Sequence, residues 1–222
     1  MRLTASIEST DKPARALEID QARELRAKIA ADKKAVARDL PDFTDMMAAS
    51  GLRIGERAAI VWDAVDLDAG AVEVRGTVVR VRGVGLIIKP APKSKSGYRT
   101  IELPSWAVAM LRARRPADAQ PGDPVFTAPR GGLRDPSNTN ADLKEVFEAA
   151  GYAWVTSHVY RKTVASMMDD AGLSARAAAD QLGHAKVSMT QDRYFKRKVS
   201  RTGAAAILEV IAEPPSRHQG CG

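Results

Sequence analysis

The N-terminal part of the chain carries apolar residues at near-helical spacing between polar ones. This pattern predicts a helix over residues 17–37, with Asp20 as a candidate N-terminal cap. A second helix is predicted over residues 40–50, because Pro41 suits the first turn of a helix and Gly51 suits its end. The folded part of the chain is therefore expected to begin with helices.

The period of the pattern changes in the middle of the chain. A short helix is expected to begin after Gly51 and to end near Trp62. The next segments, at residues 71–81, 85–91 and 98–104, are short, rich in β-branched residues and separated by Gly, Pro, Lys and Ser. They predict a small antiparallel sheet in which KSKSG, residues 93–97, is one connecting turn.

Helical spacing returns after Pro104. The predicted helices cover residues 105–115, 140–151, 157–172, 174–183 and 204–212. Asn140 is a candidate cap of its helix, and residues 127–138 before it are expected to form a loop. The whole pattern predicts an α+β fold that is mostly helical, with one small antiparallel sheet.

The distribution of polar residues predicts one folded domain with two flanking segments. Residues 1–16 are expected to be a linker or lead-in, residues 17–200 the domain, and residues 201–222 a C-terminal helix with a flexible tail. The sequence has no continuous apolar run of the roughly 18 residues that a membrane span needs, and no apolar core of a secretory signal. We therefore expect a cytoplasmic protein with no membrane partner.

The charge balance favours a polyanionic partner. The chain has 34 Lys and Arg against 27 Asp and Glu, which gives a net charge of +7. A basic surface gains affinity for nucleic acid by displacing counterions from phosphates, although charge alone fits a merely soluble basic protein equally well. With three His and a single Cys, Cys221, the sequence predicts neither an intramolecular disulfide nor a metal site.

Three separated segments carry residues that suit chemistry on one phosphate. GLRIGE contains Arg53 and Glu56, HVYR contains His158 and Arg161, and LGHAKVSMTQDRY contains His184 and Tyr194. Each segment alone has an ordinary explanation: a surface ion pair, a chance HxxR, or a buried tyrosine at a helix end. Their order along one chain, with a lysine-bearing hairpin between the first two, is much less common by chance.

In this order and spacing the chain resembles the tyrosine recombinases, specifically the phage-type integrases, over residues 17–200. The resemblance implies the catalytic fold of that family and a site in which Tyr194 is the nucleophile. It matches the remaining catalytic positions to Arg53, Lys93, His158, Arg161 and His184, with Glu56 as the supporting acidic residue. Lys95 is an alternative to Lys93, because a serine follows it too. The sequence departs from the family pattern at Tyr160 and Lys162, where leucine and a second histidine are usual.

These residue types suit phosphodiester cleavage without a metal, ATP or another cofactor. Two arginines supply bidentate donors to the negatively charged phosphate oxygens. The phenol of a tyrosine, with a reference pKa of about 10, needs a base such as His158 and a positive field to lose its proton. The resemblance implies that Lys93 protonates the departing 5′ oxygen and that His184 donates a hydrogen bond to a phosphate oxygen.

The resemblance also implies partners and a wider function. It implies a site-specific recombinase acting on double-stranded attachment-site DNA in integration and possibly excision, as a homotetramer on DNA with accessory bending or directionality factors. The N-terminal core-binding domain usual in the family does not fit into the first 16 residues. The apolar residues of the last predicted helix fit docking on the same domain or on a neighbouring copy. A type IB topoisomerase and a non-catalytic DNA-binding module are the alternative functions.

Overall fold

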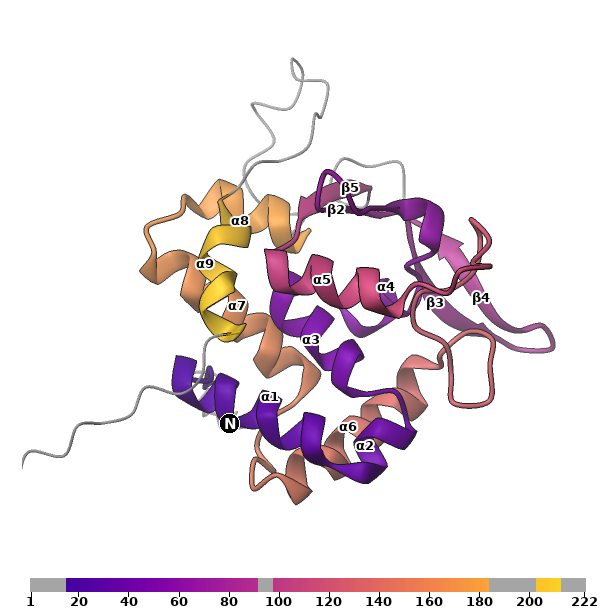
Figure 1. The fold of residues 1–222 in the computed structure, drawn as a ribbon, viewed down its shortest axis with the longest axis horizontal. Helices are drawn as coiled ribbons and strands as arrows, with labels where there is room; N and C mark the ends of the chain where they lie inside the picture. The colour runs from indigo at the N-terminus through magenta and orange to yellow at the C-terminus, as the bar shows by residue number, and fades with distance from the viewer. Residues whose placement is uncertain (1–14, 92–97, 184–202, 213–222) are drawn as a thin grey trace, which may run out of the picture.

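Helix α3 (Pro41–Ser50) forms the centre of the molecule. The computed structural model describes residues 15–91, 98–183 and 203–212. Within them, seven of the ten residues of α3 are buried, and α7 (Ser157–Asp170) packs beside it (Figure 1). The other helices surround this pair, so α3 has apolar neighbours on most sides rather than on one stripe.

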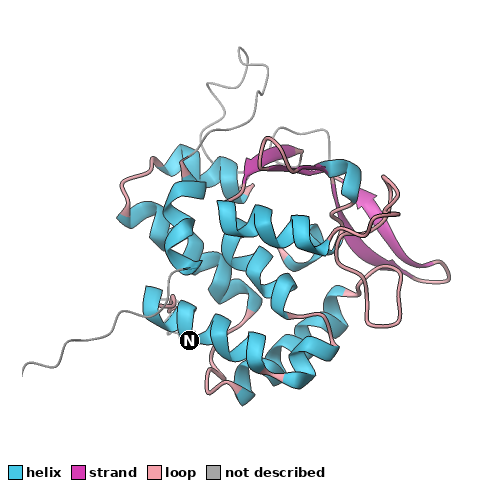
Figure 2. Ribbon diagram, in the orientation of Figure 1, coloured by secondary structure: helices cyan, strands magenta, loops and turns pink. Residues whose placement is uncertain are grey.

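Helices make up most of the described chain, and two small sheets lie at one side (Figure 2). The other helical elements are α1 (Ile19–Ala31), α2 (Lys33–Ala37), α4 (Ile54–Ala58), η1 (Trp62–Ala64), α5 (Ser105–Arg114), α6 (Pro136–Ala149), α8 (Ala175–Leu182), α9 (Ala204–Leu208) and η2 (Glu209–Ala212). The expected α+β class, mostly helical with antiparallel strands, is confirmed.

The strands form two antiparallel sheets where the sequence predicts one. A three-stranded sheet has the order β1 (Val65–Asp66), β2 (Ala71–Val74) and β5 (Arg99–Glu102). Strands β3 (Gly76–Val81) and β4 (Gly85–Pro90) pair only with each other among the described strands. The segment predicted as one strand over 71–81 is interrupted at Arg75, so its two halves belong to different sheets.

One predicted helix is divided into two and another begins earlier than predicted, and both corrections come from capping. The helix predicted over 17–37 is two helices, because Asp32 adopts an extended conformation and its carboxylate accepts the Ala35 N–H at 2.7 Å. Its first cap is Glu18 rather than Asp20. Helix α6 begins at Pro136, because Asp135 accepts the Ser137 N–H at 2.7 Å. Asn140, the predicted cap, therefore lies inside α6, and part of the predicted loop is helical.

The short helix after Gly51 also differs from its prediction. It ends at Ala58, and Trp62 instead begins the separate turn η1. The helices predicted over 105–115, 157–172 and 174–183 are confirmed within one residue at their N-termini and within two at their C-termini.

The C-terminal helical segment packs on the domain from which it extends. Leu208 and Ile211 are buried, and the Trp106 indole donates a hydrogen bond to the Leu208 carbonyl at 2.9 Å. The Arg23 guanidinium in α1 donates to the Val210 carbonyl at 2.6 Å. In this structure, α9 and η2 therefore dock in cis, which was one of the two arrangements expected from sequence.

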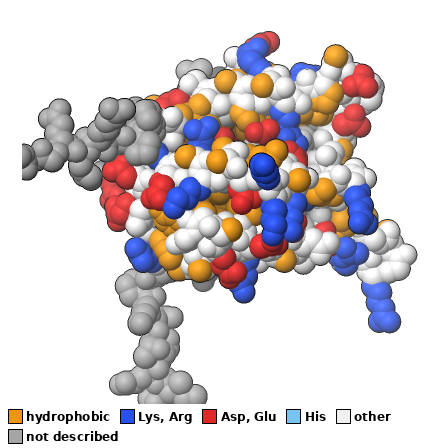
Figure 3. Space-filling view, turned by 60° about the horizontal axis from the view of Figure 1, so that its bottom comes forward, with side chains coloured by type: hydrophobic (Ala, Val, Ile, Leu, Met, Phe, Trp, Pro, Cys, Tyr) orange, Lys and Arg blue, Asp and Glu red, His pale blue; other side chains and the backbone are white. Residues whose placement is uncertain are grey.

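The surface around α1, α2 and α6 carries paired charges. Basic and acidic side chains are interspersed on the face shown in Figure 3. Lys34 and Arg38 of this region both contact Glu145, at 3.1 Å and 2.7 Å. Acidic partners offset the charge of these cations. This face is therefore less suited to bind phosphates than a surface on which arginines outnumber carboxylates would be. In the described parts of the chain no helix is long and apolar enough to cross a membrane.

Candidate active site

The end of α3 and the start of α4 position Arg53. Gly51 ends α3 in the left-handed conformation, with φ of 65°, and Arg53 then starts α4 in an extended conformation. One turn later, the Glu56 carboxylate accepts the Arg53 N–H at 3.0 Å and pairs with its Nη1 at 3.1 Å. The Glu56 side chain is 12% exposed and the Arg53 side chain 52%. The carboxylate therefore holds a guanidinium that remains open to solvent.

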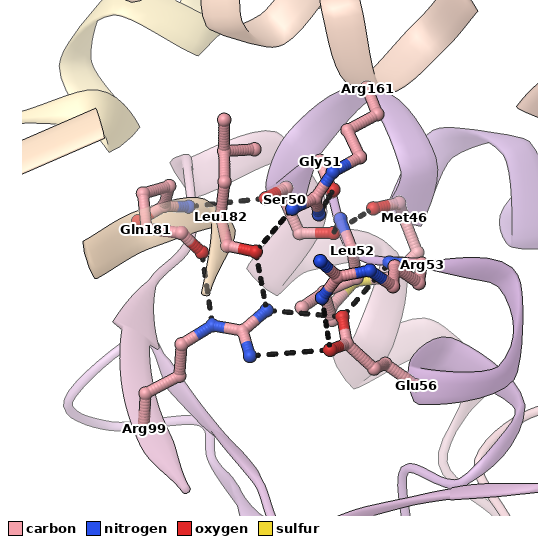
Figure 4. Close-up of polar contacts among 10 residues, drawn as sticks. All are labelled: Met46, Ser50, Gly51, Leu52, Arg53, Glu56, Arg99, Arg161, Gln181 and Leu182. Atoms are coloured by element: carbon pink, nitrogen blue, oxygen red, sulfur yellow. Dashed lines mark hydrogen bonds and ion pairs between the residues drawn. The ribbon is translucent and has the colours of Figure 1, made fainter. Parts of the chain in front are cut away.

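Helix α7 brings Arg161 to the same place. Thr156 caps this helix by accepting the Val159 N–H at 3.3 Å. The Arg161 side chain is buried and donates through Nη1 to the Gly51 carbonyl at 2.7 Å and through Nη2 to the Leu182 carbonyl at 2.5 Å. Arg161 is thus anchored to Gly51 at the end of α3 and to Leu182 at the end of α8 (Figure 4).

Burial lowers the pKa of Arg161 to about 10, and the positive charge of Arg53 contributes in the same direction. A pKa of about 10 still leaves the guanidinium protonated at neutral pH. Two arginines, from α4 and α7, are therefore close enough to repel each other, and an anion between them would relieve that repulsion.

A third arginine, Arg99 on β5, completes the cluster, and the sequence reasoning missed it. Its Nη2 lies 3.1 Å from Glu56 Oε2, and its Nε donates to the Gln181 carbonyl at 3.1 Å (Figure 4). Strand alternation was the available signal, because Arg99 and Ile101 lie on one face of a strand and that face is buried. The residues predicted as site residues in this region were lysines only.

Glu56 is the carboxylate of the cluster, and it pairs with two of the three guanidinium groups, those of Arg53 and Arg99. Burial raises the pKa of Glu56, but the charge and hydrogen bonds of Arg99, with those of Arg53, outweigh burial and leave the pKa below its ordinary value. Glu56 is therefore ionised at neutral pH. Three guanidinium groups against one carboxylate give the cluster an excess of positive charge, which suits a phosphate diester.

Gln181 ties the end of α8 to the central helix. Its side-chain amide donates to the Ser50 carbonyl at 3.3 Å. Ser50 is the last residue of α3, and its hydroxyl donates to the Met46 carbonyl at 2.5 Å. The ends of α3 and α8 and the start of α4 are thus fixed to one another, and these three segments support the arginine cluster.

The other site residues from sequence are only partly placed. His158 lies in the first turn of α7, three residues before Arg161, where its side chain is exposed and has no hydrogen bond in the described part of the chain. Lys93, its alternative Lys95, His184 and Tyr194 lie outside the described residues. Within the described residues no group of three or more His, Cys, Asp or Glu is arranged to hold a metal ion.

The departures from the family pattern have a structural explanation in one case. Tyr160 is buried and stacks on Phe147 with ring centroids 5.7 Å apart, so it serves the core between α6 and α7. Lys162 is half-buried, and nothing in the structure explains its identity.

Solved structures share this fold. The integrase of transposon Tn1549, in complex with transposon right end DNA, superposes with a TM-score of 0.72 at 19% identity, over 90% of this chain and 66% of that one. The XerA recombinase gives a TM-score of 0.58 at 23% identity, over 80% of this chain and 58% of that one. The expected tyrosine recombinase catalytic fold is confirmed.

Curated proteins and a family model agree with the fold. The tyrosine recombinase XerC of Corynebacterium efficiens is 28% identical over 171 residues, or 77% of this chain and 51% of the relative. A tyrosine recombinase XerC-like protein of Caldanaerobacter subterraneus subsp. tengcongensis is 26% identical over 166 residues, or 65% of this chain and 42% of the relative. The chain thus spans about half the length of the curated relatives it matches. The model of the phage integrase family matches residues 15–201, and the chain belongs to that family.

Proposed function

We propose that the protein is a site-specific DNA recombinase that cleaves and rejoins DNA through a covalent bond between Tyr194 and a 3′ phosphate. The observation that carries this proposal is the convergence of Arg53 and Arg161, from separate helices, on the Gly51 and Glu56 region. Family membership and the DNA complex of the Tn1549 integrase support the same class of reaction.

The free N–H groups of the two arginines favour binding of the scissile phosphate. Arg53 uses its Nη1 on Glu56, and its Nε and Nη2 have no partner among the described residues. Arg161 uses one hydrogen of each terminal nitrogen on a backbone carbonyl, which leaves further N–H groups for a ligand. Guanidinium groups fixed in this way stabilise the extra negative charge of a pentavalent phosphorus without reorganising during the reaction.

In the proposed step the Tyr194 phenolic oxygen attacks phosphorus and the bond from phosphorus to the 5′ oxygen breaks. The phenol loses its proton to His158, and Lys93, or Lys95 in its place, gives a proton to the departing 5′ oxygen. His184 donates a hydrogen bond to a phosphate oxygen. One phosphodiester replaces another, so the step needs no ATP, and a 5′ hydroxyl of a second strand reverses the chemistry to rejoin the DNA.

The test is capture of the covalent intermediate. The protein is incubated at low salt with nicked duplexes that carry candidate attachment sites, because the nick lets a short strand diffuse away and traps the adduct. Denaturing electrophoresis and peptide mapping then locate any bond to DNA. We expect an adduct at Tyr194, and Tyr194→Phe should bind the same duplexes without forming one.

Tyr152→Phe is the matched control. The Tyr152 hydroxyl donates at 2.7 Å to Glu24 of α1, a helix that carries none of the arginines of the cluster, so this variant should still form the adduct. An adduct that persists in Tyr194→Phe refutes the assignment of the nucleophile. A wild-type protein that binds these duplexes but forms no adduct with any of them refutes the recombinase proposal.

The same proposal extends to the partner and the assembly. We propose double-stranded attachment-site DNA as the partner, with four copies of the protein on the paired sites and accessory bending or directionality factors. The cytoplasm is the proposed place of action. Cis packing of α9 and η2 is compatible with a protein that is monomeric before it binds DNA. Residues 17–200 remain the proposed limits of the catalytic domain.

A further inference from the structure

Arg99 differs from the other two arginines of the cluster in its surroundings. Its side chain is 3% exposed, whereas that of Arg53 is 52% exposed. Each of its three nitrogens has a protein partner: Nε donates to the Gln181 carbonyl, Nη1 lies 3.4 Å from Glu56, and Nη2 contacts both Glu56 and the Leu182 carbonyl at 3.3 Å. A guanidinium engaged on all sides is poorly placed to bind a phosphate itself.

Arg99 instead holds the last turn of α8. The final carbonyls of a helix have no partner within the helix and carry partial negative charge. Arg99 satisfies those of Gln181 and Leu182, and Arg161 donates a second hydrogen bond to Leu182 at 2.5 Å. Residue 183 lies directly on the Arg99 guanidinium, because a Cβ added to Gly183 would be 2.4 Å from Nη1. The helix end and the arginine thus fit closely against each other.

The other contact of Arg99 reaches the phosphate-binding side of the cluster. Glu56 pairs with Arg99 at 3.1 Å and with Arg53 at 3.1 Å, so one carboxylate joins the buried guanidinium to the exposed one. Arg99 follows the segment that carries Lys93, and α8 ends just before His184 in the sequence. A single side chain, that of Arg99, therefore links three separate parts of the chain: its own strand β5, the start of α4 and the end of α8.

We infer that Arg99 is a positioning residue for strand cleavage: it fixes the end of α8, which lies two residues before His184 in the sequence, against the Glu56–Arg53 pair. The inference rests on the proposed function. Lysine cannot replace arginine here, because one ammonium group cannot reach two carbonyls and a carboxylate in the same fixed plane.

The activity test compares Arg99→Lys with wild type in single-turnover cleavage of a nicked duplex. Loss of register should slow cleavage on the order of 10²-fold, as small misplacements of catalytic groups do, while DNA affinity stays unchanged. Arg114→Lys is the matched control. Arg114 is also largely buried and contacts Asp42 at 2.9 Å and the Val125 carbonyl at 2.7 Å, away from the cluster, so its cleavage rate should match wild type once corrected for the folded fraction.

A double-mutant cycle separates positioning from general stability. If Arg99 acts through the segment after α8, Arg99→Lys should cost little further rate in a His184→Ala background. An undiminished loss in that background overturns the inference. Should Arg99→Lys fail to fold, Gly183→Ala leaves Arg99 in place but displaces the helix end from it, and it should show the same loss of rate and the same dependence on His184.

Hydrogen exchange gives a readout that does not depend on activity. Amides in peptides that cover α8 up to Gly183 should exchange faster in Arg99→Lys than in wild type, while peptides from α5 should not change. Unchanged exchange at the end of α8 overturns the inference even if no DNA is cut. A wild-type protein without any covalent adduct refutes the recombinase proposal instead, so the two failures are distinguishable.

Discussion

Replacement of Gly51 by alanine tests whether the turn between α3 and α4 is as tightly packed as the structure shows. Gly51 has φ of +65°, and an added Cβ would lie 2.6 Å from Leu182 Cδ2 and 3.1 Å from Val164 Cγ1. The left-handed conformation costs alanine about 1–2 kcal/mol, and overpacking of a tight core site adds about 1–3 kcal/mol. We therefore expect Gly51→Ala to lower the free energy of unfolding by about 2–5 kcal/mol.

Gly172→Ala separates strain from packing in this prediction. Gly172 follows the end of α7 with φ of +76° and has nothing within 4 Å of an added Cβ, so only the conformational cost of about 1–2 kcal/mol applies. Urea denaturation of both variants measures the difference, with a slope of about 2 kcal/mol/M that converts the Gly51→Ala loss to a midpoint shift of about 1–2.5 M. Equal midpoints for the two variants refute the reasoning, because the contacts of Gly51 would then cost nothing.

Two further predictions concern buried charge. Arg57 is fully buried over Phe43, two of its nitrogens lack partners in the described structure, and burial lowers its pKa to about 9. Arg57→Met should therefore raise the free energy of unfolding by about 1–3 kcal/mol at pH 7. This gain should shrink above pH 9, because the folded wild type then loses the Arg57 proton that its unfolded chain retains. Chemical denaturation at pH 7 and at pH 10.5 measures the gain and its decrease. An Arg57→Met variant that is less stable than wild type at pH 7 contradicts the predicted gain. Glu56→Gln should lose about 1.5–3 kcal/mol near neutral pH, because the charged hydrogen bonds to Arg99 weaken. Because the pKa of Glu56 is lowered in the folded state, the difference in unfolding free energy between wild type and Glu56→Gln should persist above pH 4.5, the ordinary pKa value. It should vanish as the pH falls below 4.5 through the lowered pKa. A difference that stays constant down to pH 2 contradicts the assignment.

Helical spacing and turn residues predicted the fold class and most helices, because those signals are local in sequence. The errors arose where two local signals competed. Asp32 broke a pattern that continued through it, and Asp135 capped α6 five residues before the predicted cap Asn140. The division of the sheet at Arg75 depends on long-range pairing of β2 with β5, which no local pattern contains.

Prediction of the candidate site shows the same difference between local signals and long-range contacts. Arg53, Glu56 and Arg161 were selected from short motifs and the resemblance, and the structure places these three together. Arg99 was missed because a single arginine in a strand has no motif, and its importance depends on carbonyls some 80 residues away along the chain. The roles of His158, His184, Tyr194 and Lys93 stay predictions from the motifs and the resemblance.

The carbonyls of Gly51 and Leu182, which hold Arg161, belong to the main chain, and every residue type carries such a group. Substitution at position 182 therefore leaves the acceptor itself intact, provided that the helix still ends at the same point. The support of the arginine therefore depends on the path of the main chain, and the limits on the sequence fall on Gly51 and Gly183, where an added Cβ would lie 2.6 Å and 2.4 Å from a neighbouring side chain.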